Sequence, residues 1–267
     1  AKNITFAMPA AAMMCVRFLF AALIFAPYVF IKNGWRLPKP ERLLTYLVLS
    51  IPLVGFFWAM FESLRYTSVM NTGALYCSVP AITAVYAFII NKERQSLIRT
   101  LGLLLGTFGA LWIVFKGDLN ALLSLSFNRG DIIFLMGCLL MGIYNPLIKK
   151  FYKNEPMEVM TFWVLLSAGV ILAFVSFSDL TQIEWLEIPF SVYSGLAYVS
   201  IFTTLITFFL VQFCTVKIGA TRVASFGLLT PLFVMVLSVV TGFDEFKLIL
   251  LPGILLVVLA LFIIQRK

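Results

Sequence analysis

The sequence predicts an all-α, polytopic integral membrane protein from its composition, its long apolar runs and the placement of its charges. Of its 267 residues, 62% are hydrophobic and 12% are charged, against about 45–50% and 25% in soluble domains. A membrane-spanning helix takes about 20 apolar residues, so about nine or ten helices would fill nearly the whole chain. We therefore expect the function to reside within the bilayer.

Nine apolar runs are long enough to cross a bilayer as helices. The connections between them are short and carry most of the charged residues. The expected spans are residues 7–31, 43–62, 69–90, 97–115, 132–148, 157–178, 190–213, 223–243 and 248–264.

The basic residues predict the orientation of these spans. Fourteen of the twenty Lys and Arg residues lie after the first, third, fifth, seventh and ninth spans, five lie on the opposite side, and Arg17 lies inside a span. The positive-inside rule places the fourteen in the cytoplasm. The C-terminus is therefore expected to be cytoplasmic and the N-terminus to lie outside.

Several classes of chemistry are disfavoured by what the sequence lacks. It contains no histidine, and its four cysteines are scattered in or at the ends of apolar runs, where packing explains them. It contains no phosphate-binding Gly-x-x-x-x-Gly-Lys-Ser/Thr loop. Its net charge of +8 is dispersed over short loops, which is a topology signal and no indication of nucleic-acid binding. We expect no cofactor, no metal, no ATP hydrolysis and no nucleic-acid partner.

An internal repeat divides the chain into two halves. Pro80, Glu93 and Gly102 are matched by Pro231, Asp244 and Gly253, each 151 positions later. The expected repeats are residues 1–116 and 117–267. An odd number of helices separates equivalent positions, so the two halves are expected to have opposite orientations, as in many secondary transporters.

The same repeat predicts a tenth helix. Pro9 and Lys2 are matched by Pro156 and Lys149 at an offset of 147. Lys149 follows the complete span 132–148, whereas only one residue precedes Lys2. We expect a ten-helix protein, five plus five, whose first helix is missing from this sequence.

The repeated residues and their surroundings resemble a known family. The pattern comprises Pro9, Arg17-Phe-Leu-Phe-Ala-Ala-Leu, Leu64-Arg-Tyr-Thr-Ser-Val, Pro80, Glu93 and Gly102, echoed by Ile218-Gly-Ala, Pro231, Asp244, Glu245 and Gly253. In this order it resembles the EamA-type members of the drug/metabolite transporter superfamily. The resemblance implies a bacterial inner-membrane carrier of small metabolites, such as amino acids or drug-like compounds, that often works outward. Asp244 matches Glu93 by spacing, whereas the resemblance favours Glu245.

Two charged residues at membrane depth are candidate functional residues. Arg17 lies about eight residues into the first span, where a charge is costly unless it is paired or faces a wet cavity. It could have a structural role, in which it snorkels outward or binds backbone carbonyls at a helix break, or it could act as a counter-charge for a substrate carboxylate. Glu62 is the only acid within an expected apolar run. It could pair with Arg17 and carry protons, or it could be a hydrated interfacial acid bonded to Arg65.

Other residues are candidates because of their position. Glu93, Asp244 and Glu245 lie at membrane edges, where an acid at a helix start is stabilised by the helix dipole, and a structural role is favoured. Pro80 and Pro231 interrupt helices at equivalent positions and are candidate hinges or gates. The polar and aromatic candidates for a substrate pocket are Trp58, Tyr76, Ser78, Tyr144, Asn145, Trp163, Thr203, Thr204 and Thr207. Together they would suit an amphipathic or zwitterionic molecule, although each could instead serve in helix packing.

Three glycines form one helix face in the fourth span. Gly102, Gly106 and Gly109 recur at helical spacing, a pattern that lets another helix approach closely. The approaching helix could belong to the same chain or to a second copy in a homodimer. The sequence leaves both alternatives open.

These observations predict a secondary transporter and no enzyme. We expect an exporter or exchanger with alternating access between the two inverted repeats, partnered by the lipid bilayer, a small-molecule substrate and either protons or a counter-solute. The alternatives are an intramembrane enzyme acting on a lipid or isoprenoid, a channel, and a non-transporting membrane scaffold. The enzyme would need clustered acids or a nucleophile with its base at membrane depth, which the sequence does not supply.

Overall fold

The computed structural model describes residues 9–266 apart from 35–36, 119, 121–126 and 244. Within these residues every regular element is a helix, which confirms the predicted all-α class. Nine candidate membrane spans lie in the described part of the chain. They are Ala10–Asn33, Pro40–Ser63, Val69–Asn91, Leu97–Val114, Arg129–Phe151, Met157–Val175, Phe190–Ile218, Ala220–Val240 and Leu248–Gln265. Each overlaps one expected run, with ends shifted by a few residues.

Some spans are single α-helices and others are composed of several helical segments. The single helices are α2 (Ala10–Asn33), α3 (Pro40–Ser63), α6 (Leu97–Val114), α8 (Arg129–Phe151) and α9 (Met157–Val175). The segmented spans are α4 (Val69–Tyr76) with α5 (Val79–Asn91); α11 (Phe190–Tyr198), η2 (Val199–Ile206) and α12 (Thr207–Ile218); α13 (Ala220–Ser225), η3 (Phe226–Leu229) and α14 (Thr230–Val240); and η4 (Leu248–Leu250) with α15 (Leu251–Gln265). Two short helices, α10 (Phe177–Gln182) and η1 (Trp185–Glu187), connect α9 to α11.

The chain forms two compact units. Unit 1 comprises Ala1–Trp58 and Phe151–Val216, and unit 2 comprises Ala59–Lys150 and Lys217–Lys267. Each unit therefore combines a segment of the first expected repeat with a segment of the second. The repeats of the sequence and the compact units of the structure are different divisions of the same chain, and each unit is described here by itself.

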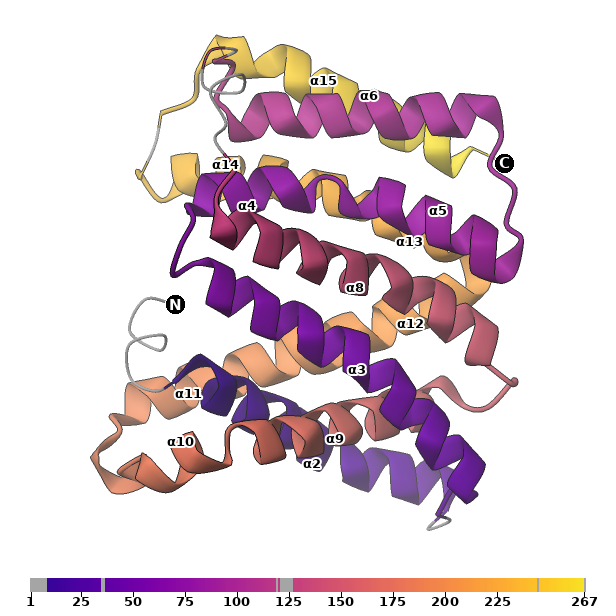
Figure 1. The fold of residues 1–267 in the computed structure, drawn as a ribbon, viewed down its shortest axis with the longest axis vertical. Coiled ribbons are helices and arrows are strands. Elements are labelled where there is room, and N and C mark those ends of the chain that lie inside the picture. The colour runs from indigo at the N-terminus through magenta and orange to yellow at the C-terminus, as the bar shows by residue number, and fades with distance from the viewer. Residues whose placement is uncertain (1–8, 35–36, 119, 121–126, 244, 267) are drawn as a thin grey trace. The chain divides into compact units, whose positions relative to one another are not determined.

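In unit 1, α2 packs against α9 and against η2 (Figure 1). The approach of α2 to α9 depends on Gly169, because a Cβ atom there would lie 2.5 Å from Leu19 Cδ2 and 3.2 Å from the Leu19 backbone nitrogen. The Cys15 thiol donates a hydrogen bond to the Gly169 carbonyl over 3.5 Å. Cys15 thus has the packing role expected for a buried cysteine.

In unit 2, α6 and α15 lie side by side (Figure 1). Gly102 faces Ile263, and Gly109 faces Gly253, so the two helices run antiparallel. A Cβ atom on Gly109 would lie 2.8 Å from the Gly253 carbonyl oxygen, and one on Gly106 would lie 2.9 Å from the Ala260 Cβ. The glycine face predicted in α6 is therefore covered by α15 of the same chain.

The two repeat-equivalent prolines each follow an interruption of a span. Pro80 is the second residue of α5, and Pro231 is the second residue of α14. Proline is tolerated in the first turn of a helix because backbone N–H groups in that turn have no intrahelical acceptor, so the N–H that proline lacks is not needed there. The turns before them close with short-range bonds, from the Ser78 N–H to the Leu75 carbonyl and from the Thr230 N–H to the Gly227 carbonyl. Both predicted interruptions are present, and their role as hinges stays a prediction.

Candidate functional site

Arg17 lies inside a candidate span of unit 1, as the eighth residue of α2. Its guanidinium reaches the span formed by α11, η2 and α12. Nε donates to Thr204 Oγ1, and Nη2 donates to Thr203 Oγ1 over 2.8 Å and to the Thr203 carbonyl over 3.3 Å. A half-buried cation and two hydroxyl groups 186 and 187 positions away thus form one hydrogen-bonded cluster, here called the Arg17 cluster.

The two threonines belong to η2, a π-helical segment within the span. The Thr203 hydroxyl donates to the Val199 carbonyl over 2.9 Å, and the Thr204 hydroxyl donates to the same carbonyl, five residues earlier, over 3.3 Å. Because each hydroxyl donates its single hydrogen to the helix backbone, it can only accept hydrogen bonds from Arg17. π-Helical turns in α-helical spans are frequently found at functional sites.

Aromatic side chains surround the Arg17 cluster. The guanidinium carbon lies 5.7 Å from the centre of the Phe57 ring, within the range of a cation–π interaction. Phe57 is in turn 5.6 Å from Phe18 and 6.4 Å from Phe208, and Phe18 is 6.0 Å from Phe208. An apolar surrounding of this kind strengthens any electrostatic interaction that Arg17 makes.

The positive charge of Arg17 has no carboxylate partner within the described residues of unit 1. Thr203 and Thr204 are neutral, and the nearest acceptor to Nη1 is Met14 Sδ at 3.9 Å. Arginine carries five N–H donors, and the threonines engage those of Nε and Nη2, so the two donors of Nη1 remain for an incoming anionic group. The bond to the Thr203 carbonyl is the backbone contact expected of a structural arginine, and binding of a substrate carboxylate stays a prediction.

Glu62, the predicted partner of Arg17, lies near the end of α3 in unit 2. It forms an ion pair with Arg65, three residues later, with Arg65 Nε and Glu62 Oε2 3.4 Å apart. This is the interfacial arrangement that the sequence left open as the alternative.

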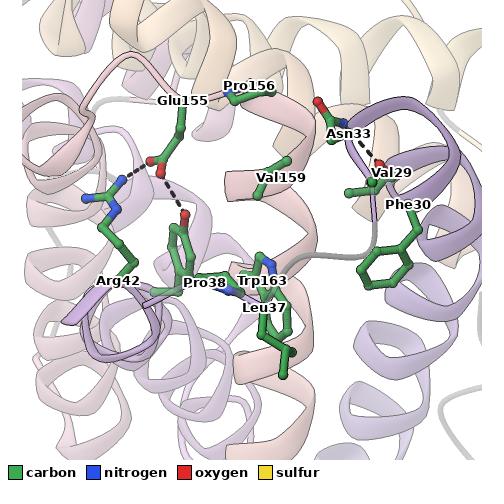
Figure 2. A pocket seen from close by; sticks show the side chains of 12 residues that line it. Val29, Phe30, Asn33, Leu37, Pro38, Arg42, Glu155, Pro156, Val159 and Trp163 are labelled. Atoms are coloured by element: carbon green, nitrogen blue, oxygen red, sulfur yellow. Dashed lines mark hydrogen bonds and ion pairs between the residues drawn. The ribbon is translucent and has the colours of Figure 1, made fainter. Parts of the chain in front are cut away.

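The remaining predicted pocket residues are divided between the two units. In unit 1, Trp58 has 54% of its surface exposed, Thr204 belongs to the Arg17 cluster, and Trp163 lines a pocket shown in Figure 2. In unit 2, Ser78 donates to the Leu75 carbonyl over 2.6 Å and lines a pocket of about 210 Å³ together with Asp131.

Three other predicted residues lie within unit 2. Tyr76 is the last residue of α4, and Tyr144 is fully buried in α8. Asn145 is 5% exposed, and its side-chain oxygen lacks a hydrogen-bond partner in the described part of the chain. A buried acceptor without a partner is costly, and a role of Asn145 in substrate binding stays a prediction.

The predicted edge acids differ in their surroundings. Glu93 accepts from Lys149 Nζ over 2.6 Å, joining the loop after α5 to the end of α8 within unit 2. Glu245 is exposed. Asp244 lies outside the described residues.

Sequence reasoning missed two buried acids. Asp131 and Glu158 lie in the first turns of α8 and α9 and are only 2% and 8% exposed, so the view that Glu62 is the only acid within a span is wrong. Asp131 accepts from Thr67 Oγ1 over 2.5 Å and from the Asn128 N–H over 2.9 Å. The reciprocal bond from the Asp131 N–H to Asn128 Oδ1 makes this a capping box, a pattern that the sequence carried in Asn-x-x-Asp.

Comparison with known proteins agrees with this architecture. A family model described as "EamA-like transporter family" matches residues 1–115 and 128–266. "Uncharacterized transporter YyaM" of Bacillus subtilis (strain 168) is 27% identical over 243 residues, which cover 90% of this chain and 79% of that protein. "Uncharacterized transporter YoaV" of the same organism is 27% identical over 150 residues, covering 55% of this chain and 51% of that protein.

A solved crystal structure with 16% sequence identity has the same fold, with a TM-score of 0.79 over 98% of this chain and 90% of that one. The matched family model covers both halves of the chain, and the described residues form the multi-pass helical structure that the family name leads one to expect. The chain therefore belongs to the EamA-like transporter family.

Proposed function

We propose that this EamA-family transporter is a secondary carrier that exports or exchanges small metabolites, and that Arg17 binds an anionic group of the substrate. The single observation that supports the proposal best is the uncompensated guanidinium within a membrane span, held by two neutral threonines. A charge at this depth commonly marks a substrate or ion pathway. Amino acids and amphipathic drug-like compounds that carry a carboxylate are the proposed substrates.

The proposed mechanism is alternating access between two inverted repeats, residues 1–116 and 117–267. Three features support it: the repeat spacing in the sequence, the equivalent helix interruptions at Pro80 and Pro231, and the π-helical segment that receives Arg17. Discontinuous helices that bind substrate near the midplane are a common feature of inverted-repeat transporters. The proposed location is the inner membrane with a cytoplasmic C-terminus, and the proposed driving force is a proton gradient or a counter-solute.

The test is uptake of radiolabelled amino acids, nucleosides and quaternary amines into proteoliposomes containing the purified chain. Saturable uptake by the wild-type chain is the expected result. Arg17→Ala should lower uptake of carboxylate-bearing substrates by at least about a hundredfold, because one charged partner is lost in an apolar site. Arg17→Lys should restore only part of it, since an ammonium group lacks the planar fork of donors.

Arg65→Ala is the matched control, because Arg65 is an exposed arginine of the other unit that forms an ion pair with Glu62. It should transport at the wild-type rate. Wild-type uptake by an Arg17→Ala protein with a normal elution profile would reject the binding role of Arg17.

A further inference from the structure

A pocket of about 330 Å³ lies in unit 1 between the end of α2, the start of α3 and the start of α9 (Figure 2). Its volume is near the lower end of the range for small-molecule sites. Asn33, at the end of α2, is 16 residues from Arg17, which corresponds to roughly 24 Å along a helix axis. The pocket is thus separate from the Arg17 cluster.

One side of the pocket carries a largely buried ion pair. Arg42 pairs with Glu155, and the two side chains are only 17% and 15% exposed. Tyr46 donates from its hydroxyl to Glu155 Oε2 over 2.7 Å, and its ring lies 5.5 Å from the Arg42 guanidinium carbon. Arg42 Nη1 also donates to the Phe151 carbonyl over 3.1 Å. The pocket wall therefore contains one cation and one anion.

The opposite side contributes an amide and aromatic rings. Asn33 Nδ2 donates to the Val29 carbonyl over 3.1 Å and to Glu158 Oε1 over 3.5 Å. Because both partners can only accept, the orientation of the amide is fixed. Its oxygen has no hydrogen-bond partner among the described residues and lies on the side away from Val29 in Figure 2. Phe30 and Trp163 line the apolar part.

We propose that this pocket binds a small amphipathic zwitterion. Its anionic group would pair with Arg42, its ammonium group would bind Glu155 and the Asn33 oxygen, and its apolar body would lie against Phe30 and Trp163. A ligand of one charge sign would engage one member of the ion pair and leave the other poorly compensated, which is costly for largely buried charges. A zwitterion complements both. A free solute and the headgroup of an ethanolamine phospholipid share this chemistry.

The experiment measures binding of three probes to the full chain in phosphatidylglycerol nanodiscs by titration calorimetry. The probes are leucine, 3-methylbutylamine, which lacks the carboxylate, and 4-methylpentanoate, which lacks the amine. Leucine should bind about tenfold or more tightly than either relative. The same order should hold in the Arg17→Ala protein, so that a failure of the proposed transport function does not obscure this result.

Two variants reverse the charge preference if the proposal is correct. Arg42→Gln leaves Glu155 as the only charge of the pair, so the amine should become the preferred probe. Glu155→Gln leaves Arg42, so the acid should become preferred. Misfolding would weaken the binding of all three probes and would not reverse the preference in opposite directions in the two variants. If one variant elutes as an aggregate, the other variant is sufficient for the test. Glu184→Gln, which changes an exposed acid of unit 1, should behave as wild type.

The membrane composition identifies the source of the zwitterion. If adding phosphatidylethanolamine to the nanodiscs weakens leucine binding, the lipid headgroup occupies the pocket; if binding is unchanged, the occupant is a solute. The proposal is overturned if leucine does not bind, if the amine or the acid binds as tightly as leucine, or if neither variant changes the order of preference.

Discussion

The contacts between helices inside unit 1 and inside unit 2 include two different kinds. In unit 2, α6 and α15 meet through glycines, and a Cβ atom on Gly109 would lie 2.8 Å from a backbone oxygen of α15. In unit 1, the segment η2 meets α2 through hydrogen bonds to the half-buried guanidinium of Arg17. Helices in lipid gain little from hydrophobic burial, so close packing and polar contacts must stabilise them. Both units also contain the other kind of contact, at Gly169 in unit 1 and at Asp131 in unit 2, but in unit 1 a cation of a candidate span is held by neutral side chains.

The largest expected effect comes from adding a methyl group where α6 and α15 are in close contact. Gly109→Ala should destabilise the protein by about 3 kcal/mol, since the new methyl group meets backbone that cannot move aside. Thermal unfolding in detergent, followed by size-exclusion chromatography, measures it. Gly73→Ala is the matched control, because its Cβ would meet only Val114 at 3.9 Å. Equal stability of the two variants would refute the close packing of α6 against α15 through Gly109.

A second prediction tests whether unit 2 also contains an essential polar contact. Asp131→Asn should lower the free energy of unfolding by about 2 kcal/mol, because a buried carboxylate bound by Thr67, Asn71 and the Asn128 N–H is replaced by a neutral amide. The same thermal assay measures the change. Glu187→Gln, at an exposed acid, is the control and should leave the unfolding curve in place. An unshifted Asp131→Asn curve would contradict the structural role of this capping box.

A third prediction sharpens the role of unit 1. Thr204→Val removes the acceptor of the Arg17 Nε hydrogen bond while keeping the shape of the side chain. Transport should fall by about tenfold, equivalent to roughly 1.4 kcal/mol, because Arg17 loses one of its two hydroxyl partners. Initial uptake rates in proteoliposomes give the measurement. Thr181→Val is the comparison, because the Thr181 hydroxyl bonds the Ser178 carbonyl at an exposed site. If both threonine variants transport equally well, the π-helical segment does not position Arg17.

The smallest effect on stability is expected at Glu62. The Glu62–Arg65 pair is exposed, with side-chain exposures of 24% and 73%, so Glu62→Gln should change stability by less than about 0.5 kcal/mol. If Glu62 couples transport to protons, this variant should also lose the pH dependence of uptake, measured between pH 5.5 and about pH 8. A pH profile identical to that of the wild-type chain would exclude proton coupling through Glu62.

Much of the candidate site could be named from the sequence, but its contacts could not. The depth of Arg17 followed from counting residues in an apolar run, and the structure finds it as the eighth residue of α2. Thr204 was named only as one of several polar residues at membrane depth. The Thr204 hydroxyl that accepts from Arg17 lies in a π-helical segment. The spacing of apolar residues predicts a helix in this region, but it does not show that one turn contains an extra residue.

The buried acids show a second limit of sequence reasoning. Glu155 lies just before α9, and Glu158 lies in its first turn. The apolar pattern of the sequence predicts only that a loop ends and a span begins in this region. Their burial arises from Arg42 and Lys32, contributed by helices more than 100 positions earlier. Nothing local in the sequence distinguishes such acids from hydrated ones. The signal available was the preference of acids for the first turn of a helix, which is common to exposed and buried sites alike.

The sequence by itself determined the class, the spans and the interruptions of this protein. The reason is physical: about 20 apolar residues are needed to cross a bilayer, which is a local signal. The two interruptions were marked by prolines at repeat-equivalent positions, whereas Pro27, Pro52 and Pro146 lie inside uninterrupted helices. Only the tertiary structure decided that α15 covers the glycine face of α6, that η2 holds Arg17, and that Arg42 and Glu155 meet beside a pocket. Those pairings join segments far apart in the chain, and they depend on which helices pack together.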